Sequence, residues 1–480
     1  TIRIVKGANM EMERVDASLH GWPLATFSDK RATDANCHRM LEYGMRADRL
    51  AAVRLGIASH NLFTLAYGLV LAHRENAWNQ VQFEMLEGMA NHQRRALFEL
   101  TRNVLLYAPA CRQEDFVNAI GYLVRRLDEN TGEQNFLRHA FSLEVDDPTW
   151  QRLEQGFLDA FSRIEKLSDD SKRKLLRRDF GDVAAKAKDA AASAPNGGDF
   201  SKAPDTDSSL PATSQWANAI LQQQQQASAI DVPLVIGGEE IFDAQTIRES
   251  CDPSRPRVVV ARCCQGDQAA VQRAVEHARA DPTGWRSRGF EARRRLLHET
   301  ARVLEASRGR LLGTMLADGG KTFAESDPEV SEAVDFCRFY ANSALEFHQR
   351  DRLAPWNFPL AIPCGGVAAA LASGNCVILK PASDTAWTAY EMCRCFWEAG
   401  VPRDALQLLP CSGSTVGQQL VSHNDVDAVI LTGGTETARQ MLGRDPTMHL
   451  LAETGGKNAT IVTALADRDQ AIENVLHSAF

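Results

Sequence analysis

The first 147 residues alternate short apolar runs with amphipathic stretches, and this alternation limits the possible folds more than any other feature. The apolar runs, each long enough for a strand, cover residues 3–6, 24–27, 51–57, 81–86 and 104–106. Helical periodicity separates them around residues 36–46, 62–75, 92–101 and 114–127. Strands that alternate with helices favour parallel β/α units. The sequence therefore predicts a parallel sheet, in either a doubly wound domain or a barrel.

Small and polar residues collect directly after the predicted strands. They are Lys6, Gly7, Ala8, Ser28, Lys30, Thr33, His60, Asn61 and Tyr107. Barrel active sites are built from the segments that follow the strands. A dinucleotide-binding doubly wound sheet carries GxGxxG after its first strand, and that motif follows none of these runs. A full barrel needs roughly 200 residues or more, so we expect a half-barrel or, with better reason, a sequence that begins inside a longer protein.

A pair of arginines marks the segment 107–132. Arg125 and Arg126 are adjacent in a predicted helix, and Glu129 follows one turn later. Adjacent guanidinium groups repel, and each planar fork can bind a carboxylate bidentately. The alternative is a solvated helix face on which Arg125 and Glu129 form an i, i+4 pair. The segment follows a strand end, on a turn like those of Lys6 and His60. This position favours the interpretation in which Arg125 and Arg126 form an anion clamp, that is, they bind one anion together.

Length and composition exclude some classes of protein. With 480 residues the chain can form two or more domains. Its formal charge of −9 does not indicate a nucleic-acid partner. The 11 cysteines are scattered and lack the paired CxxC spacing of a zinc site, which favours a reduced cytoplasm. Residues 353–379 carry no charge, but repeated Pro and Gly favour a packed core there over a membrane span.

Residues 148–232 differ from the segments on either side. Their first part predicts a charged helix with an apolar stripe of Trp150, Leu153, Phe157, Phe161 and Ile164. Residues 184–226 are rich in Ala, Asp, Ser and Gly and end in five glutamines, a composition typical of a linker or a weakly ordered segment.

From residue 233 to residue 480 the sequence predicts a second α/β domain. Two Gly-rich turns, at 411–415 and 432–437, each connect a predicted strand to a predicted helix. Backbone amides at such helix starts bind anions such as a pyrophosphate. A tight turn without a ligand is the alternative for each.

The first region resembles a known family. RIVKGAN (3–9), GWPLATFSDKRATD (21–34), IASHN (57–61) and YLVRRLDEN (122–130) are similar to the C-terminal part of the flavin barrel of proline dehydrogenase, as found in the bifunctional proline utilization A enzymes. The resemblance implies that Tyr107, Arg125 and Arg126 bind proline. It implies FAD contacts from Arg3, Lys6, Gly7, Ala8, Ser28, Lys30, Thr33, His60, Asn61 and Glu129. A plain helix cap is the alternative role of His60 and Asn61.

The second region resembles the pyrroline-5-carboxylate (glutamate semialdehyde) dehydrogenase branch of the aldehyde dehydrogenase superfamily. APWNFP (354–359), KPASDT (380–385), GSTVG (413–417), TGGTETA (432–438) and ETGGK (453–457) occur in the family's order. The resemblance implies that Asn357 donates to an oxyanion and that Glu453 is a general base. It implies NAD contacts from Lys380, Ser414, Gly417, Gly434 and Thr435. A surface lysine, a backbone-bonded asparagine and a strand-end carboxylate are the alternatives for Lys380, Asn357 and Glu453.

Together the resemblances predict the C-terminal part of a (β/α)8 barrel in residues 1–147, a helical and linker segment in 148–232, and an aldehyde-dehydrogenase-type Rossmann-like α/β domain in 233–480. They imply FAD-dependent oxidation of L-proline to pyrroline-5-carboxylate, then NAD-dependent oxidation of glutamate semialdehyde to L-glutamate. They also imply a quinone as electron acceptor, a homo-oligomer, and a cytoplasmic protein that contacts the inner membrane at its periphery.

Three departures from the family pattern qualify these expectations. Asn9 and Met10 stand where relatives often carry an aromatic pair, and a strand expected before APWNFP is missing at 350–353. The family's cysteine nucleophile lies after the glutamate, and no cysteine follows Cys411. The rival hypotheses are that only the proline step is active, or that the dehydrogenase-like region is a non-catalytic scaffold.

Overall fold

The structure is a computed structural model, and it describes residues 1–7, 10–132, 135–168, 170, 202–243, 245–343, 359–456 and 459–479. The chain divides into two compact units. Unit 1 comprises Thr1–Leu19, Pro23–Lys174 and Ala459–Phe480, and unit 2 comprises His20–Trp22 and Leu175–Asn458.

Unit 1 is built on a four-stranded parallel sheet. Its strands are β1 (Ile2–Val5), β2 (Leu55–Ala58), β3 (Val81–Leu86) and β4 (Val104–Tyr107), and they pair in sequence order. A doubly wound sheet reverses its strand order at a switch point, whereas the strands of a barrel follow one another around the axis. The sheet is therefore an arc of a barrel, and the barrel alternative is confirmed.

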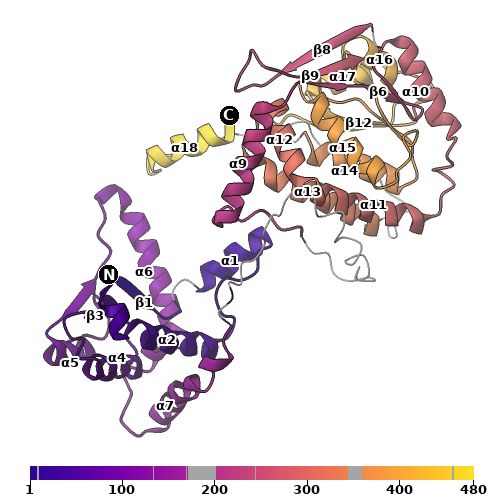
Figure 1. The fold of residues 1–480 in the computed structure, drawn as a ribbon. Coiled ribbons are helices and arrows are strands. Elements are labelled where there is room, and N and C mark those ends of the chain that lie inside the picture. The colour runs from indigo at the N-terminus through magenta and orange to yellow at the C-terminus, as the bar shows by residue number, and fades with distance from the viewer. Residues whose placement is uncertain are drawn as a thin grey trace. The chain divides into compact units, whose positions relative to one another are not determined.

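Helices pack on one face of this sheet (Figure 1). The helices of unit 1 are α1 (Met10–His20), α2 (Lys30–Gly44), α3 (Ala47–Leu50), α4 (Leu62–Arg74), α5 (Asn91–Thr101), α6 (Phe116–Thr131), α7 (Pro148–Phe161) and α18 (Arg468–Ala479), with 3-10 turns at Gln113–Asp115, Phe136–Arg138 and Ile164–Lys166. Gly68 of α4 lets this helix approach closely, because a Cβ there would lie 2.8 Å from Ile57 Cδ1 and 3.1 Å from Phe83 Cε1.

The predicted strand at residues 24–27 is wrong. Those residues form a bent loop after Pro23, and Ala25, Thr26 and Phe27 line a cavity. Their apolar side chains mark the wall of a cavity and not a strand of the core. The periodicity also missed α1, whose apolar residues Met12, Val15 and Leu19 are more than half exposed.

An aromatic cluster joins α7 to α2 and α4, and it encloses His38. The imidazole of His38 is stacked on Phe161 at 4.4 Å between ring centroids, and it meets Phe157 and Tyr67 edge-on at 4.6 Å and 5.6 Å. The predicted apolar stripe at 150–164 therefore packs on the barrel, although only Pro148–Phe161 is α-helical. His38 has no exposed surface.

Mild acid is expected to destabilise unit 1 through His38. Burial, with Lys6 nearby, lowers the pKa of His38 from 6.5 to about 4. Between these values the unfolded chain binds more protons than the folded one, so stability falls as pH falls through this window. The complete loss is on the order of 2–3 kcal/mol. Hydrogen exchange in α7 between pH 7 and pH 4 measures it.

A matched variant isolates this contribution. His38→Phe keeps a ring in the cluster and cannot be protonated, so the slope of stability against pH should become shallower. Part of the slope should remain, because burial also lowers the pKa of His60 to about 4. An unchanged slope in His38→Phe would contradict the assignment.

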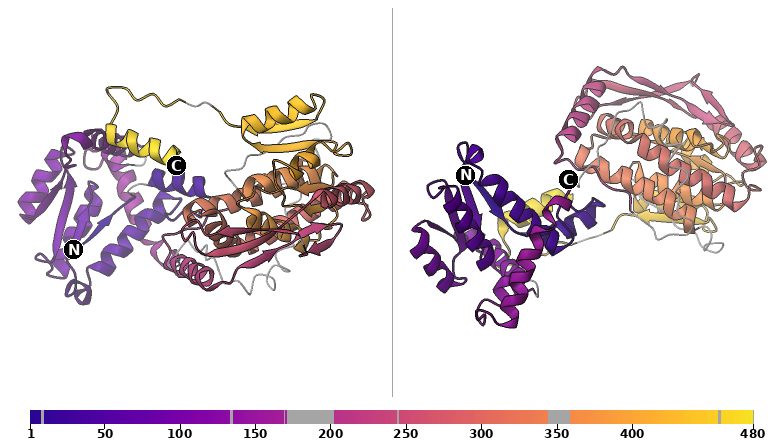
Figure 2. Two further views of the ribbon diagram at one scale, coloured as in Figure 1. Left: turned by 90° about the horizontal axis from the view of Figure 1, so that it is seen from above. Right: turned by 60° about the horizontal axis from the view of Figure 1, so that its bottom comes forward.

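The described residues of unit 2 form three sheets. One has the order β10-β11-β6-β7, a second has the order β5-β9-β8, and the third is the parallel pair β12-β13. Their bounds are β5 (Ile230–Val232), β6 (Leu234–Ile236), β7 (Glu239–Ile241), β8 (Thr246–Cys251), β9 (Val259–Gln265), β10 (Val377–Leu379), β11 (Leu406–Leu408), β12 (Val429–Gly433) and β13 (Leu450–Thr454). Figure 2 shows β12 and β13, in yellow, as a small layer of their own.

The helices of unit 2 are α9 (Pro211–Gln226), α10 (Gln268–Ala280), α11 (Phe290–Ala306), α12 (Arg308–Gly319), α13 (Phe323–Ser343), α14 (Ala361–Ala372), α15 (Ala386–Glu398), α16 (Val416–Val421) and α17 (Thr435–Arg444). Helices lie on both faces of the β10-β11-β6-β7 sheet, with α14 and α15 on one face and α10 on the other. One apolar core lies among α11–α15, and a second lies under α10 and α16. The sequence did not reveal α12.

The glutamine run at 222–226 is not a linker, which corrects that prediction. These residues end helix α9, where Ile220 is buried and Gln224 lies against Gly313 of α12. Residues 211–221 of the predicted linker belong to the same helix, and residues 184–201 lie outside the described residues. Among the helices that the structure describes, none combines the length and the apolarity that crossing a bilayer requires.

Candidate functional site

The first group of predicted residues lies at the carboxyl ends of the parallel strands of unit 1. Lys6 follows β1, and its Nζ lies 3.2 Å from Asp34 Oδ1 and donates to Thr64 Oγ1 at 3.3 Å. Lys30 Nζ donates to the other oxygen of Asp34 at 2.6 Å. Burial alone would raise the pKa of Asp34, but Lys6 and Lys30 outweigh it and lower the pKa. Two ammonium groups therefore share one carboxylate, which leaves this end of the sheet positively charged.

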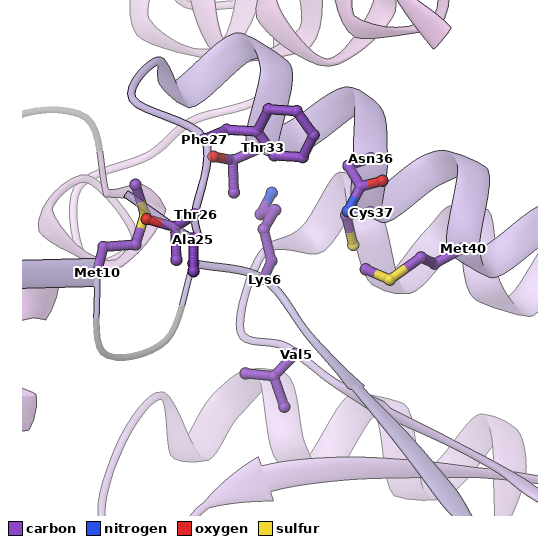
Figure 3. Close-up of a pocket in the computed structure, with 11 residues that line it drawn as sticks. Val5, Lys6, Met10, Ala25, Thr26, Phe27, Thr33, Asn36, Cys37 and Met40 are labelled. Carbon is purple, nitrogen blue, oxygen red and sulfur yellow. The ribbon is translucent and has the colours of Figure 1, made fainter. Parts of the chain in front are cut away.

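A cavity of about 280 Å³ opens beside Lys6. Figure 3 shows Lys6 between the loop that carries Ala25 and Thr26 and the helix that carries Asn36 and Cys37. Gly7 and Thr33 also line this cavity. Gly7 has φ +69°, a left-handed conformation that glycine adopts without strain. Three predicted residues, Lys6, Gly7 and Thr33, thus line one cavity, and Lys30 is connected to Lys6 through Asp34.

The remaining cofactor residues of unit 1 have local structural roles as well. The Asn61 side chain accepts from the backbone N–H groups of Phe63 and Thr64 at 3.0 and 3.2 Å, so it caps α4. His60 Nε2 accepts from Leu86 N at 3.1 Å, which fixes the ring between β2 and β3. Ser28 precedes Asp29, the cap of α2, and is exposed. The helix-cap alternative therefore applies to Asn61, and His60 is a neutral ring held by the backbone.

The predicted proline residues lie on β4 and α6. Tyr107 ends β4, and the guanidinium of Arg3 lies over its ring at 4.7 Å from the centroid. Arg125 is exposed on α6, while Arg126 lies over the ring of Tyr122 at 5.4 Å. Glu129 belongs to the same helix, but its side chain lies outside the described part of the structure, as does Ala8. The structure joins Tyr107 to Arg3 and places Arg126 against its own helix.

Lys380, Ser414 and Gly417 form a group in unit 2. The parallel pairing of β10 with β11 brings Lys380, after β10, beside the turn that follows β11. A Cβ on Gly417 would lie 3.6 Å from Lys380 Cε and 3.1 Å from the carbonyl oxygen of Ser412. Ser414 Oγ is 3.2 Å from Ser412 Oγ in the same turn. Burial lowers the pKa of the Lys380 ammonium.

The second pair of strands carries the other dehydrogenase residues. Thr432 of β12 is in register with Glu453 of β13, and Gly434 and Thr435 open α17 directly after β12. Thr435 Oγ1 donates to Gly455 O at 3.3 Å. Gly434, Thr435 and Glu453 are all exposed. Asn357 lies outside the described residues.

Sequence reasoning missed some residues of the first site. Asp34, which pairs with both lysines, and Cys37 and Met40, which line the cavity, were not singled out. The spacing of Lys30 and Asp34 as an i, i+4 pair was the available signal for Asp34. Cys364 of α14 packs in the core of unit 2, where it is fully buried and burial raises the pKa of its thiol well above the usual value.

The two regions match two protein families. Residues 1–139 match the proline dehydrogenase model, and residues 242–353 and 351–480 match that of the aldehyde dehydrogenase family. The chain is 31% identical over 517 residues to Bifunctional protein PutA of Escherichia coli, an alignment that covers 100% of this chain and 36% of that protein. A 1-pyrroline-5-carboxylate dehydrogenase of Staphylococcus epidermidis is 29% identical over 58% of this chain and 60% of its own length.

Solved structures show the same two-part likeness. Proline utilization A from Corynebacterium freiburgense is 35% identical with a TM-score of 0.73, over 100% of this chain and 43% of that one. Proline utilization A from Bdellovibrio bacteriovorus, inactivated by N-propargylglycine, is 27% identical with a TM-score of 0.83, and the match covers 100% of this chain and 49% of that one. A Thermus 1-pyrroline-5-carboxylate dehydrogenase with bound NAD is 30% identical with a TM-score of 0.54, and the match covers 59% of this chain and 61% of that one.

Fold, site and likeness together define the class of protein: an α/β chain that joins a proline dehydrogenase region to an aldehyde dehydrogenase region. The chain belongs to the proline utilization A family. It spans 36–37% of the length of the curated PutA relatives that it matches.

Proposed function

We propose that the protein carries out two consecutive oxidations in proline catabolism. Unit 1 oxidises L-proline to pyrroline-5-carboxylate with FAD. Unit 2, after the ring has opened with water, oxidises glutamate semialdehyde to L-glutamate with NAD. The observation that carries the proposal is the positively charged cavity at the strand ends of unit 1, in a chain that also matches the aldehyde dehydrogenase family.

The residues of unit 1 fit a flavin in charge and shape. Lys6 and Lys30 share one counter-ion, and Gly7 and Thr33 leave the hollow open beside them. Arg3, which is paired with Glu84, places its guanidinium over the ring of Tyr107 at the end of β4. Positive charge at this place favours an anionic reduced ring. Ala8, Ser28, His60, Asn61 and Glu129 complete the proposed cofactor contacts.

Tyr107 and the two arginines of α6 are proposed to hold proline. The guanidinium groups of Arg125 and Arg126 bind its carboxylate, and Tyr107 shapes the ring pocket. FAD, when bound, accepts the hydride from C5 of the ring. The protein then mainly has to orient the substrate and exclude water, which alone can contribute several kcal/mol to a barrier.

The residues of unit 2 fit a dinucleotide at two features. Lys380 lies beside the turn at Ser414 and Gly417, and a side chain at position 417 would fill that space. Gly434 and Thr435 offer the amide end of α17 to an anion. Asn357 is the proposed oxyanion donor, and Glu453 is the proposed base that activates water. NAD, when bound, accepts a hydride from the aldehyde carbon.

The division of the chain and its setting belong to the same proposal. Residues 1–147 form the flavin region, residues 148–232 the connection, and residues 233–480 the NAD region. The electron acceptor of the first reaction is a quinone, and the protein is a homo-oligomer. It is located in the cytoplasm and contacts the inner membrane at its periphery when it reduces the quinone.

The first reaction is tested with the purified protein. It should bind FAD and show the absorption of an oxidised flavin, and anaerobic L-proline should bleach that absorption. D-proline serves as the control, because it presents its carboxylate with the opposite stereochemistry. Absence of bleaching by L-proline in flavin-loaded protein would overturn the assignment of unit 1.

The second reaction depends on Lys380 through NAD binding. Lys380→Ala should weaken NAD binding by about 10–100-fold, the effect expected for a lost hydrogen bond from a charged donor. Isothermal titration with NAD measures this without turnover. Arg439→Ala, which removes an exposed cation from α17, is the control and should bind NAD normally. Equal affinity in Lys380→Ala and the unsubstituted protein would refute the role of Lys380.

A further inference from the structure

Four residues of unit 1 lie on the same face of its sheet, one on each strand. Arg3 of β1 is in register with Gly56 of β2, and Gly56 with Gln82 of β3. Glu84 lies two residues beyond Gln82, so it shares the face of Arg3 and Gly56. Glu84 is in register with Leu105, and Tyr107 lies two residues further on. The row Arg3, Gly56, Glu84 and Tyr107 thus crosses the sheet towards its carboxyl end.

Glu84 reaches Arg3 across an intervening strand. A Cβ on Gly56 would lie 2.3 Å from Glu84 Oε1 and 3.1 Å from its carboxyl carbon. The carboxylate therefore occupies the space that any larger residue at position 56 would fill. Its other oxygen forms an ion pair with Arg3 Nε. Glu84 is only 4% exposed, so this ion pair is partly removed from water.

Arg3 in turn meets Tyr107. Its guanidinium lies 4.7 Å from the centroid of the Tyr107 ring, within the range of a cation–π contact. The side chain of Arg3 is 39% exposed. Glu84 pairs with Arg3 at Nε, and the guanidinium carbon of Arg3 lies over the face of the Tyr107 ring. The chain of contacts therefore runs from a buried carboxylate through a cation to Tyr107.

We propose that Glu84 is a positioning residue of the proline site: through Arg3, it sets the charge and the orientation of the Tyr107 wall. This inference rests on the proposed function of unit 1, in which Arg3 faces the flavin and Tyr107 faces proline. Gly56 is part of the same arrangement, because it leaves the space through which Glu84 reaches Arg3.

The charge of Glu84 also limits the positive charge near the flavin. The Glu84 carboxylate is paired with the Arg3 guanidinium, so it offsets the positive charge of Arg3. Lys6 and Lys30 then remain the main source of positive charge at the strand ends. Removing the negative charge of Glu84 would add the uncompensated charge of Arg3 to theirs. A more positive site stabilises the anionic reduced flavin.

Glu84→Gln separates charge from shape. The amide fills the same space, but it cannot neutralise Arg3. The midpoint potential of the bound flavin should shift to a more positive value. In addition, kcat/KM for proline should fall about tenfold, a usual coupling between contacting side chains. Glu99→Gln, which removes the same charge from an exposed position on α5, is the matched control and should change neither quantity.

A double-mutant cycle tests the role of Gly56. Gly56→Ala should displace the Glu84 carboxylate and lower kcat/KM about as much as Glu84→Gln does. In the Glu84→Ala background the space is vacated, so adding Gly56→Ala should cause little further loss. Additive losses would show that Gly56 acts independently of Glu84, and would overturn this part of the proposal.

The outcomes distinguish the inference from the function beneath it. A purely structural ion pair would lower the melting temperature of Glu84→Gln and leave the flavin potential and the proline kinetics unchanged, which would overturn the positioning role alone. If the unsubstituted protein binds FAD and L-proline does not bleach it, the proposed function fails, and the positioning role fails with it. If Glu84→Gln does not fold, Gly56→Ala gives the same readouts with the carboxylate present.

Discussion

Arg125→Ala and Arg126→Ala are each expected to lower kcat/KM for proline roughly a hundredfold or more, because the proposed role of each arginine is to form a hydrogen-bonded charge pair with the substrate carboxylate. The carboxylate takes no part in the hydride transfer. The binding energy is therefore present in both ground state and transition state, and the loss should appear mainly as a higher KM. Steady-state kinetics with a quinone analogue as acceptor measure both constants.

The charge and the geometry of the clamp can be separated. Arg126→Lys keeps the charge but loses the planar fork, so it should recover only part of the lost affinity. Arg112→Ala is the control, because Arg112 is 83% exposed and precedes α6. A proline KM that stays the same in Arg125→Ala and Arg126→Ala would show that α6 presents a solvated charged face, as the alternative interpretation holds.

The strand–helix alternation allowed most of unit 1 to be predicted, and its failure at residues 24–27 has a physical cause. Apolar runs such as residues 81–86 became strands because neighbouring strands pair with them on both sides. The run at 24–27 has the same hydrophobic character, but its side chains surround a cavity. Hydrophobicity indicates burial, and it does not distinguish a core from the wall of a binding site.

Candidate site residues could be predicted from the sequence where they directly follow a strand. They could not be predicted where, like Glu84, they contact a residue on another strand of the sheet. Lys6 and Lys380 come directly after β1 and β10, so strand ends and family motifs were enough to select them. Glu84 lies inside the buried strand β3, so its position in the sequence does not indicate a site. It reaches Arg3 only because Gly56, two residues before its register partner Ala58, leaves space for the carboxylate. The contact between Glu84 and Gly56 can be predicted only when the register of β2 and β3 is known.

A buried carboxylate in unit 2 connects the start of one helix to another part of the core. Glu329 of α13 is 1% exposed. Its Oε1 accepts from Leu360 N at 2.6 Å and from Ala361 N at 3.1 Å, the first amides of α14. Its Oε2 accepts from Lys321 Nζ at 2.7 Å. One carboxylate thus satisfies two backbone donors of a buried helix start and neutralises a partly buried ammonium.

Glu329→Leu is therefore expected to destabilise unit 2 by about 3–5 kcal/mol, the usual cost of removing one member of a buried ion pair. The free energy of unfolding in urea, with hydrogen exchange in residues 361–372 as the local probe, measures the loss. Glu299→Gln should cost less than about 1 kcal/mol, since it breaks an exposed pair with Arg302.

The double variant Glu329→Leu with Lys321→Met separates the ion pair from the helix cap. If the ion pair dominates, the double variant should be more stable than Glu329→Leu alone, because no ammonium is then left facing an apolar side chain. If the cap dominates, removing Lys321 should not help, because the amides of Leu360 and Ala361 still lack their acceptor. The geometry favours a contribution from both, since each oxygen of Glu329 has its own donors. The double variant should therefore recover part of the lost stability, and the unrecovered part measures what the carboxylate contributes to the start of α14.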